Sequence, residues 1–435
     1  MKAFITGGTG FIGRHLARRM AQTEHEMICL ARKTSDTAEL RELGANIVIG
    51  DVTDRASIMD GMRGCDWVFN LANVYSFWEP DRDIYRRVNV EGTRNVMECA
   101  LESGVSKVVH VSTIAVWGKT EESPFNEDTP PAPTRNTEYA LTKFAGDQIA
   151  RQLHRERGLP LVVVYPGAVV GSGDPKLTGA SIKRLIERRM PATVFGNVFN
   201  TYVHVRDVAE ALVRAAEKDG NIGEKYIIGN TRLTLGQFFA LVGEVSGVAM
   251  PGLRMPDAMT MLSARVLTWI ADLIKRPPLL DISLDAMRMI KDNRLADGGK
   301  AERELGLVYT PIRKAIEDEY AWYIRTSRTS ARPWAGAERR AARRKQVDLP
   351  CDVVGLAHGQ VARASARVSE LSLQGMFVKT KKPFDQGSDA SVTAVRIGTP
   401  FRVSGIIMRS TDRGMAVRFS GTIPRMIEAI LSSGG

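Results

Sequence analysis

A tyrosine and a lysine in the stretch YALTK form a pair that could transfer a proton. Tyr139 and Lys143 are four residues apart, and on a helix this spacing places both side chains on one face. A phenol with its ordinary pKa of about 10 is a poor acid or base at neutral pH, but a neighbouring ammonium stabilises the phenolate and lowers that pKa. The preceding apolar run, KVVHVST, ends in Ser112 and Thr113, which adds two hydroxyl groups to the same region of the chain.

Three glycines near the start of the chain have the spacing of a phosphate-binding turn. Gly7, Gly10 and Gly13 lie in GGTGFIG, between the apolar run KAFIT and the helix-like stretch RHLARRMA. Glycine permits a tight turn and a close approach of the backbone, and the first N–H groups of the following helix attract a pyrophosphate. The pattern predicts a bound dinucleotide.

The end of the next apolar run indicates which dinucleotide is bound. An acidic residue there would hydrogen-bond the ribose 2′-hydroxyl and repel a 2′-phosphate. The run ends CLARK, without a carboxylate. Arg32, assisted by Lys33, is placed to pair with a 2′-phosphate, so the sequence favours NADP(H) over NAD; the alternative is that Arg32 is a solvated charge at a strand end.

The elements that position these residues alternate between apolar runs and helix-like stretches up to about residue 170. This alternation predicts a Rossmann-type, doubly wound parallel sheet. The predicted strands are KAFIT, MICLA, NIVIG, WVFNLA, KVVHVST and LVVVYP. From 171 to 325 strands become sparse, which predicts a small, mainly helical substrate lobe. One stretch of this lobe, residues 258–274, resembles a membrane-surface helix, but Arg265 and Asp272 interrupt it and favour packing into the core.

The composition and residue pattern of the chain change after residue 325. Residues 326–337 are rich in Arg, Ser, Thr and Ala and contain Pro333 and Gly336, which predicts a linker. Residues 338–435 consist of short β-branched runs with frequent glycine, which predicts a C-terminal antiparallel β-barrel, with a short helix at 423–431.

Composition limits the class of protein. The chain has 435 residues and a net charge of +11. Residues 331–435 hold 17 Lys and Arg against 8 Asp and Glu, so most of the positive charge lies there and suggests an anionic partner. The four cysteines lack C-x-x-C spacing, which disfavours a zinc site or a disulfide framework. With no signal peptide and no apolar run long enough to span a membrane, we expect a cytoplasmic protein without a bound metal.

The motifs of the first 325 residues together resemble the extended short-chain dehydrogenase/reductase family, in its dihydroflavonol-reductase and sugar-epimerase branch. The shared motifs are GGTGFIG, GDV at 50–52, NLAN at 70–73, VNVEGT at 88–93, VSTIAVWG at 111–118, YALTK, YPG at 165–167, VHVRDVAEA at 203–211 and KAERELG at 300–306.

The resemblance implies a role for each matching residue. Tyr139 would protonate a carbonyl oxygen, or accept a proton in the reverse direction, and Lys143 would hold the nicotinamide ribose and lower the Tyr139 pKa. Counting back from Gly118 assigns the hydroxyl that polarises the substrate oxygen to Thr113, with Ser112 as its neighbour. The implied contacts to NADP(H) are Gly7, Thr9, Gly10, Phe11, Ile12, Gly13, Arg32, Asp51, Val52, Leu71, Ala72, Asn73, Tyr139, Lys143 and Pro166.

The substrate implied is a small molecule with a carbonyl or alcohol group. Two departures from the family pattern, Asn73 and Tyr165, disfavour a nucleotide sugar, although epimerase or dehydratase activity stays an alternative. Several residues are candidates for the substrate pocket and stay unassigned, because each is at least as well explained by core packing: Trp78, Trp117, Phe199, Tyr202 and His204.

Residues 338–435 resemble the PilZ domain, which implies cyclic di-GMP as a regulatory ligand. Arg340 and Arg344 match the family's R-x-x-x-R, and Arg339 with Arg343 satisfies it one residue earlier. Guanidinium groups bind phosphates bidentately and stack on guanine. The family's second motif is matched by Glu370, Ser372 and Gly375, with glutamate in place of Asp or Asn.

Two functions are therefore compatible with the sequence. The first is an NADP(H)-dependent oxidoreductase regulated by cyclic di-GMP. The second is a non-catalytic redox and second-messenger sensor that docks a partner protein, with the arginines as a solvated face or the barrel as a docking module. The basic stretch lacks the aromatic residues that stack on bases, which disfavours nucleic acid. We also consider a homodimer.

Overall fold

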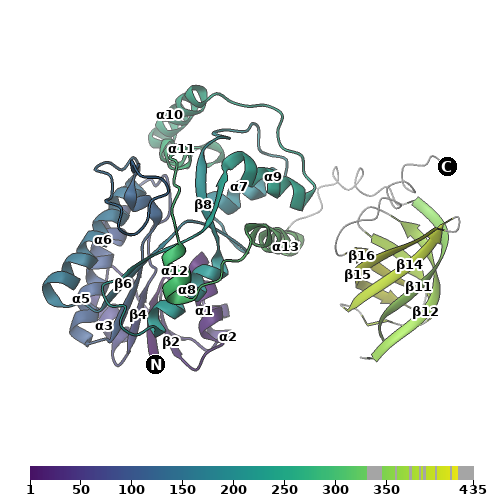
Figure 1. The fold of residues 1–435 in the computed structure, drawn as a ribbon, viewed down its shortest axis with the longest axis horizontal. Coiled ribbons are helices and arrows are strands. Elements are labelled where there is room, and N and C mark those ends of the chain that lie inside the picture. The colour runs from purple at the N-terminus through teal and green to yellow at the C-terminus, as the bar shows by residue number, and fades with distance from the viewer. Residues whose placement is uncertain are drawn as a thin grey trace. The chain divides into compact units, whose positions relative to one another are not determined.

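The computed structural model describes residues 1–330, 345–357, 360–371, 375–381, 384–385, 388–396, 399–411 and 414–419. The chain separates into two compact units, Met1–Arg328 and Thr329–Gly435 (Figure 1). Helix α13 (Ile312–Ser330) ends the first unit. This helix runs past residue 326, the predicted start of the linker; the rest of that linker, from 331, lies outside the described residues.

The first unit is built on seven parallel strands in the order β3-β2-β1-β4-β5-β6-β9 (Figure 1). Six of them are the predicted apolar runs, which confirms the doubly wound sheet. The seventh, β9, lies inside the region predicted to be mainly helical. The strands are β1 (Lys2–Thr6), β2 (Glu26–Ala31), β3 (Asn46–Ile49), β4 (Trp67–Asn70), β5 (Lys107–Val111), β6 (Leu161–Pro166) and β9 (Lys225–Ile228).

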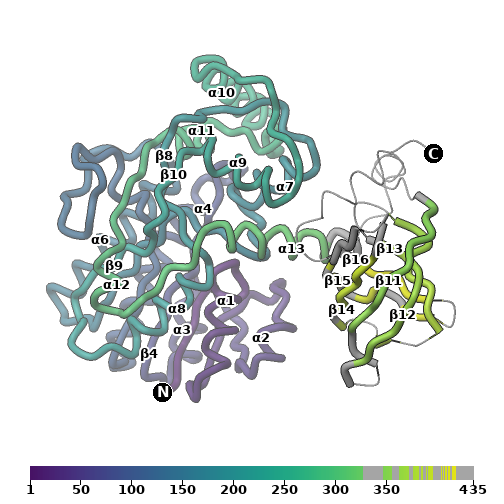
Figure 2. The backbone as a smooth tube through the Cα atoms, turned by 45° about the vertical axis from the view of Figure 1, so that its right-hand side comes forward, coloured from purple at the N-terminus to yellow at the C-terminus, as the bar shows by residue number. Residues whose placement is uncertain are grey.

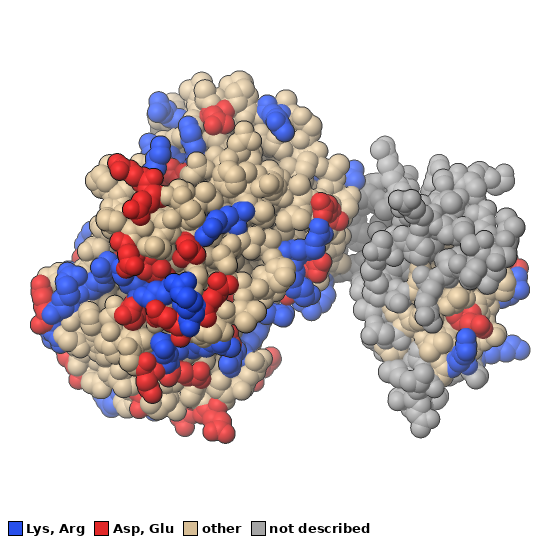
Figure 3. Space-filling model, viewed as in Figure 1, with Lys and Arg blue, Asp and Glu red and all other residues tan. Residues whose placement is uncertain are grey.

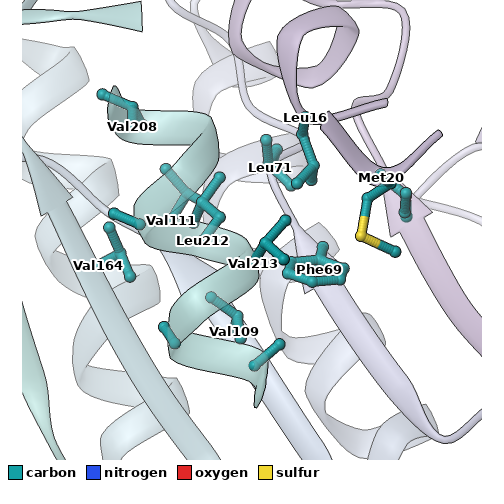
Figure 4. Close-up of a cluster of buried hydrophobic side chains, with 14 of the residues drawn as sticks. Leu16, Met20, Phe69, Leu71, Val109, Val111, Val164, Val208, Leu212 and Val213 are labelled. Carbon is teal, nitrogen blue, oxygen red and sulfur yellow. The ribbon is translucent and has the colours of Figure 1, made fainter. Parts of the chain in front are cut away.

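Helices cover both faces of this sheet, which explains why its strands are almost continuously apolar. One face packs against α1 (Phe11–Met20), α2 (Ala38–Glu42), α8 (Val205–Glu217) and α12 (Gly299–Leu305). Figure 4 shows Leu16 and Met20 of α1 and Leu212 of α8 over the strand residues Phe69 and Val109. The other face packs against α3 (Arg55–Met62), α5 (Thr93–Ser103) and α6 (Glu138–Arg157). Each large aliphatic side chain buried in this way contributes about 1.5–3 kcal/mol.

The substrate lobe is mainly helical, as predicted, and contains a sheet of three strands. Its range is not continuous, because α8, β9 and α12 return to the central sheet. The lobe's own elements are β7 (Ala168–Val170), α7 (Leu177–Ile186), β8 (Phe199–His204), β10 (Thr231–Thr234), α9 (Leu235–Ser246), α10 (Asp257–Ile274) and α11 (Leu284–Lys291). After α11 the chain runs back to α12 beside the sheet (Figure 2).

Helix α10 corrects the expectation for residues 258–274. It buries only the small residues Thr260, Ala264 and Ala271, while Trp269 is 66% and Leu273 70% exposed. Core packing is therefore wrong for most of its large apolar side chains: the small residues face α11, Met261 packs beside them, and most of the other large side chains face outward. No helix among the described residues is long and apolar enough to cross a membrane.

The second unit is an antiparallel barrel, which confirms the predicted fold class. Its strands close in the order β11-β12-β13-β16-β15-β14. Alternate residues point inward, and the interior is filled by side chains such as Val353, Val378, Val392, Ile407 and Met415. The predicted helix at 423–431 lies outside the described residues. The strands are β11 (Lys345–Ala357), β12 (Gln360–Leu371), β13 (Gly375–Lys379), β14 (Asp389–Arg396), β15 (Thr399–Thr411) and β16 (Gly414–Phe419).

Candidate active site

The first unit contains a cavity of about 1140 Å³ that extends from the glycine-rich turn into the substrate lobe. It begins at the carboxyl ends of the central parallel strands, where ligands bind in folds of this kind. All but one of the predicted cofactor residues line it. The residues that do so are Gly7, Thr9, Gly10, Phe11, Ile12, Gly13, Arg32, Asp51, Val52, Leu71, Ala72, Asn73, Tyr139 and Pro166.

The glycine-rich turn has the shape that an anionic dinucleotide requires. Gly7 has φ +72°, and a Cβ there would lie 2.7 Å from the backbone nitrogen of Ala72. A Cβ on Gly13 would lie 2.1 Å from the carbonyl oxygen of Gly7, so only glycine lets α1 pack onto the turn. Gly10 begins α1 without a side-chain cap. The first N–H groups of α1 therefore face the cavity without a side-chain partner and fit a pyrophosphate.

The adenosine end of this cavity is next to β2. Arg32 follows the last residue of β2, is exposed and lines the cavity, and Ser35 lines it nearby. The carboxylate of Asp51 also lies here, where it accepts hydrogen bonds from the backbone N–H and the hydroxyl of Thr53, at 2.9 and 2.8 Å. Arg32 thus places a positive charge on the cavity wall beside β2.

A buried asparagine fixes the loop after β4. The Oδ1 atom of Asn89, in the π-helical turn η1 (Arg86–Gly92), accepts a hydrogen bond from the N–H of Val74 at 2.7 Å. Asn73 donates to the carbonyl of Leu71 at 2.9 Å, and its buried Oδ1 has no partner among the described residues. That free acceptor lines the cavity and is available to a ligand.

Tyr139 and Thr113 meet in the wall of the cavity. Tyr139 is in the first turn of α6, and Thr113 follows β5 and caps the short 3-10 helix η2 (Ile114–Trp117). Burial raises the pKa of the Tyr139 phenol, while a hydrogen bond with Thr113 and the charge of Arg294 act to lower it. Ser112 also lines the cavity, and its buried hydroxyl has no partner among the described residues.

Lys143 lies behind this pair rather than in the cavity wall. Its Nζ donates a hydrogen bond to the carbonyl of Val111 at 2.8 Å. Burial lowers the pKa of Lys143 to about 8, and the nearby carboxylate of Asp147 opposes that shift. A second cation, Arg294, also lies near the phenol, where its charge acts to lower the Tyr139 pKa.

Arg294 and two aromatic residues lie around Tyr139, and sequence reasoning missed all three. Arg294 is 5% exposed, lines the cavity and donates to Asp292 at 2.9 Å. The ring centroids of Tyr75 and Phe77 lie 4.9 and 5.9 Å from that of Tyr139. Arg294 comes from the segment between α11 and α12, far from Tyr139 in sequence, so no local spacing could indicate it.

The rest of the cavity is a chamber inside the substrate lobe that is mostly apolar but also has polar lining residues such as Lys176, Arg184 and Asn200; we call it the apolar chamber. Of the five unassigned pocket candidates, only Tyr202 lines the cavity. Trp117 instead stacks on Phe125, and His204 caps α8 and contacts Asp318. The chamber walls are formed by Leu177, Val194, Phe238, Phe239, Met250, Met255, Leu280, Ile282, Met287, Met289 and Ile290.

Only part of the predicted cyclic di-GMP site falls within the described residues. Glu370 is in β12, where its Oε1 lies 3.4 Å from Nε2 of Gln346, and Gly375 begins β13. Arg339, Arg340, Arg344 and Ser372 lie outside the described residues.

Both units match known families. Residues 3–229 match the NAD dependent epimerase/dehydratase family, and residues 338–432 match the PilZ domain. A putative dihydroflavonol 4-reductase of Synechocystis is 30% identical over 74% of this chain and 94% of its own length. The sterol demethylase protein B of Methylococcus capsulatus is 31% identical over 74% of this chain and 98% of its own. The crystal structure of gox2253 has 34% identity and a TM-score of 0.66, covering 75% of this chain and 98% of that one.

Proposed function

Because the chain belongs to the NAD dependent epimerase/dehydratase family, we propose that it is an NADP(H)-dependent oxidoreductase acting on a carbonyl or alcohol group of an apolar small molecule. The chain joins this extended short-chain dehydrogenase/reductase unit to a PilZ domain. One observation carries the proposal: Tyr139 and Thr113 line one cavity together with the glycine-rich turn and the apolar chamber.

The proposed chemistry assigns a task to each polar group. When bound, the nicotinamide cofactor supplies the hydride. Thr113 orients the substrate oxygen, and Tyr139 delivers its phenolic proton to that oxygen during reduction. Burial keeps Tyr139 protonated at neutral pH, which suits an acid in the reductive direction. Lys143 supplies a buried positive charge behind Tyr139, and Arg294 supplies a second one beside it.

The preference for NADP(H) rests on Arg32. Its guanidinium is exposed at the end of β2 and carries no ion pair within the described parts of the chain. A 2′-phosphate would offer that guanidinium a charge-assisted, bidentate contact, whereas a plain ribose would leave it in solvent.

The apolar class of substrate is supported by the lining of the chamber and by one relative. Phe238, Met250 and Ile290 are among the many apolar residues that line the chamber, and a predominantly apolar lining suits an apolar substrate. The sterol demethylase protein B of Methylococcus capsulatus is named for a sterol, which is an apolar molecule. We propose a ketone or secondary alcohol attached to a large apolar body.

The experiment that tests this function replaces Tyr139 by Phe and follows oxidation of NADPH with a panel of apolar ketones. Loss of the proton donor should lower kcat by about 10²–10⁴, while NADPH binding, measured by fluorescence titration, should be retained. The matched control is Tyr75→Phe, which removes a phenolic hydroxyl in the same cavity without removing the partner of Thr113. Full turnover by Tyr139→Phe would refute the assignment.

We also propose that cyclic di-GMP regulates this activity through the PilZ domain. The arginines assigned to the ligand, Arg339, Arg340 and Arg344, come directly before β11 in the sequence. Binding of the dianion would regulate the activity by ordering this arginine-rich stretch of the chain. Calorimetric titration of the full chain with cyclic di-GMP tests this, and absence of heat at high micromolar ligand would leave the PilZ domain as a docking module. The cytoplasmic location and the homodimer also stay proposals.

A further inference from the structure

The outer face of α10 carries a stripe of large apolar side chains, which we call the apolar ridge: Met259, Leu262, Val266, Trp269, Leu273 and Ile274. Most of them follow one another at intervals of three or four residues, so they share one side of the helix. Their exposure runs from 48% for Val266 to 70% for Leu273. Soluble proteins seldom expose apolar patches of this extent unless something binds there.

The burial of α10 is the reverse of that in an ordinary surface helix. Its inward residues Thr260, Ala264 and Ala271 are small, so the helix lies close to α11. The helix is also held in place, because Asp272 accepts hydrogen bonds from Trp78 at 3.0 Å and from Arg82 at 2.9 Å. The apolar ridge therefore lies on a helix that is held in place by contacts to the rest of the first unit, and its side chains face outward.

Cations surround the apolar ridge. Arg254, Arg265, Lys275 and Arg276 are exposed, and none of them forms an ion pair within the described ranges of the chain. Of the two acids on the helix, Asp272 is already paired with Arg82, and Asp257 lies exposed in the first turn, so the cations remain in excess around the helix. In the space-filling view the top of the first unit, where α10 lies, is mostly uncharged, with scattered Lys and Arg and some Asp or Glu among them (Figure 3). An apolar stripe bordered by cations complements an anionic lipid surface.

The apolar ridge adjoins the cavity. Met255, Thr260 and Ser263, on or next to α10, line the cavity, and so does Leu280, which is 38% exposed. One side of the helix thus forms a wall of the apolar chamber while the other side faces outward. Since α10 is too short and too interrupted by charge to cross a membrane, it fits a position parallel to the surface.

We propose that the apolar ridge and its four cations dock the protein on an anionic lipid bilayer, with α10 lying in the headgroup region. An apolar substrate then enters the chamber from the bilayer beside Met255 and Leu280. This entry route rests on the proposed function, whereas the docking itself does not, because it depends only on the outer face of α10.

The test is sedimentation of the full chain with vesicles, without cofactor or substrate. We expect binding to phosphatidylcholine vesicles that contain phosphatidylglycerol, and weaker binding to phosphatidylcholine alone. The double variant Leu262→Asp/Leu273→Asp should weaken vesicle binding by about tenfold or more, because it places two charges in the face of α10 that would be buried in the bilayer. The matched control is Val308→Asp, which changes a side chain that is 83% exposed and lies outside the apolar ridge; it should bind as the wild type does.

Further measurements distinguish an anionic bilayer from two other groups that could cover the apolar ridge, a second copy of the chain and another part of the same chain. The pair Lys275→Gln/Arg276→Gln should reduce binding only to the anionic vesicles, and added salt should reduce it in the same way. Wild-type protein that fails to sediment with either vesicle overturns the proposal. A wild-type dimer that Leu262→Asp/Leu273→Asp converts to a monomer would assign the apolar ridge to a second copy, and a lower melting temperature of that variant without vesicles would assign it to contacts within the chain. Both outcomes refute docking, and neither affects the Tyr139→Phe experiment.

Discussion

Replacing Lys143 by Met should abolish activity and, at neutral pH, make the protein more stable. Lys143 is 3% exposed, and burial lowers its pKa from 10.5 to about 8. One pKa unit corresponds to about 1.36 kcal/mol, so holding the ammonium in the folded chain costs about 3 kcal/mol at pH 7. Methionine has a similar length and no charge. Replacing Lys143 also removes the hydrogen bond that its ammonium donates to the carbonyl of Val111, which costs about 1–2 kcal/mol. The net increase in the free energy of unfolding is therefore about 1–2 kcal/mol.

The pH dependence gives this prediction its sign. Below pH 8 the folded and unfolded chains both hold the Lys143 proton, and the folded chain carries the full penalty of burial. Between pH 8 and 10.5 the folded chain releases the proton first, so the unfolded state binds more protons and the free energy of unfolding of the wild type rises with pH. The variant lacks this rise. Its advantage should shrink through that window and reverse at the upper end, where only the lost hydrogen bond remains.

Urea unfolding at a series of pH values from 7 to above 10 measures the difference. Five of the six tryptophans precede Arg328, so tryptophan fluorescence follows the first unit. Other groups that titrate in this range are common to both proteins and cancel in the difference. A Lys143→Met variant that is less stable than the wild type at pH 7, with a constant difference up to pH 10, would refute the burial argument.

Three other perturbations have defined outcomes. Arg32→Asp should weaken NADPH binding by about tenfold or more, because a charge-assisted contact is lost, and it should improve the use of NADH. The ratio of kcat/KM for the two cofactors measures both effects, and an unchanged ratio would place the 2′-phosphate elsewhere. Gly13→Ala should lower the melting temperature and NADPH affinity, since its Cβ would meet the Gly7 carbonyl, whereas Gly252→Ala, with open space around it, should do neither. Glu370→Asp should strengthen cyclic di-GMP binding in calorimetry, because Asp or Asn is the residue that the PilZ motif expects; weaker binding would show that the longer side chain is the adapted one.

Features that depend on local sequence were predictable. The strands of the central sheet are continuous apolar runs because helices bury both of their faces, and that pattern is visible without a structure. The glycine-rich turn is equally local, since the close contact between Gly13 and Gly7 is made within one turn of chain. Thr113 and Tyr139 could be named as partners because each follows a recognisable motif.

Features that depend on the packing of distant segments were not predictable. Arg294 reaches Tyr139 only because the chain returns from α11 to the sheet. For α10, the periodicity of apolar residues identifies a helix, but it does not say whether another part of the protein covers the apolar side. The presence of Arg265 and Asp272 therefore led to the wrong expectation of core packing.

Different regions of the chain form the two parts of the cavity, and this division affects how such enzymes acquire new substrates. The part that would hold the dinucleotide is made by loops after strands of the first 170 residues, while the apolar chamber comes from later segments such as α9, α10 and α11. Duplicated genes could therefore accumulate changes at Phe238, Met250 or Ile290 and acquire new substrates while the reaction centre is inherited intact. Laboratory recombination can exploit the same division by exchanging the lobe between relatives.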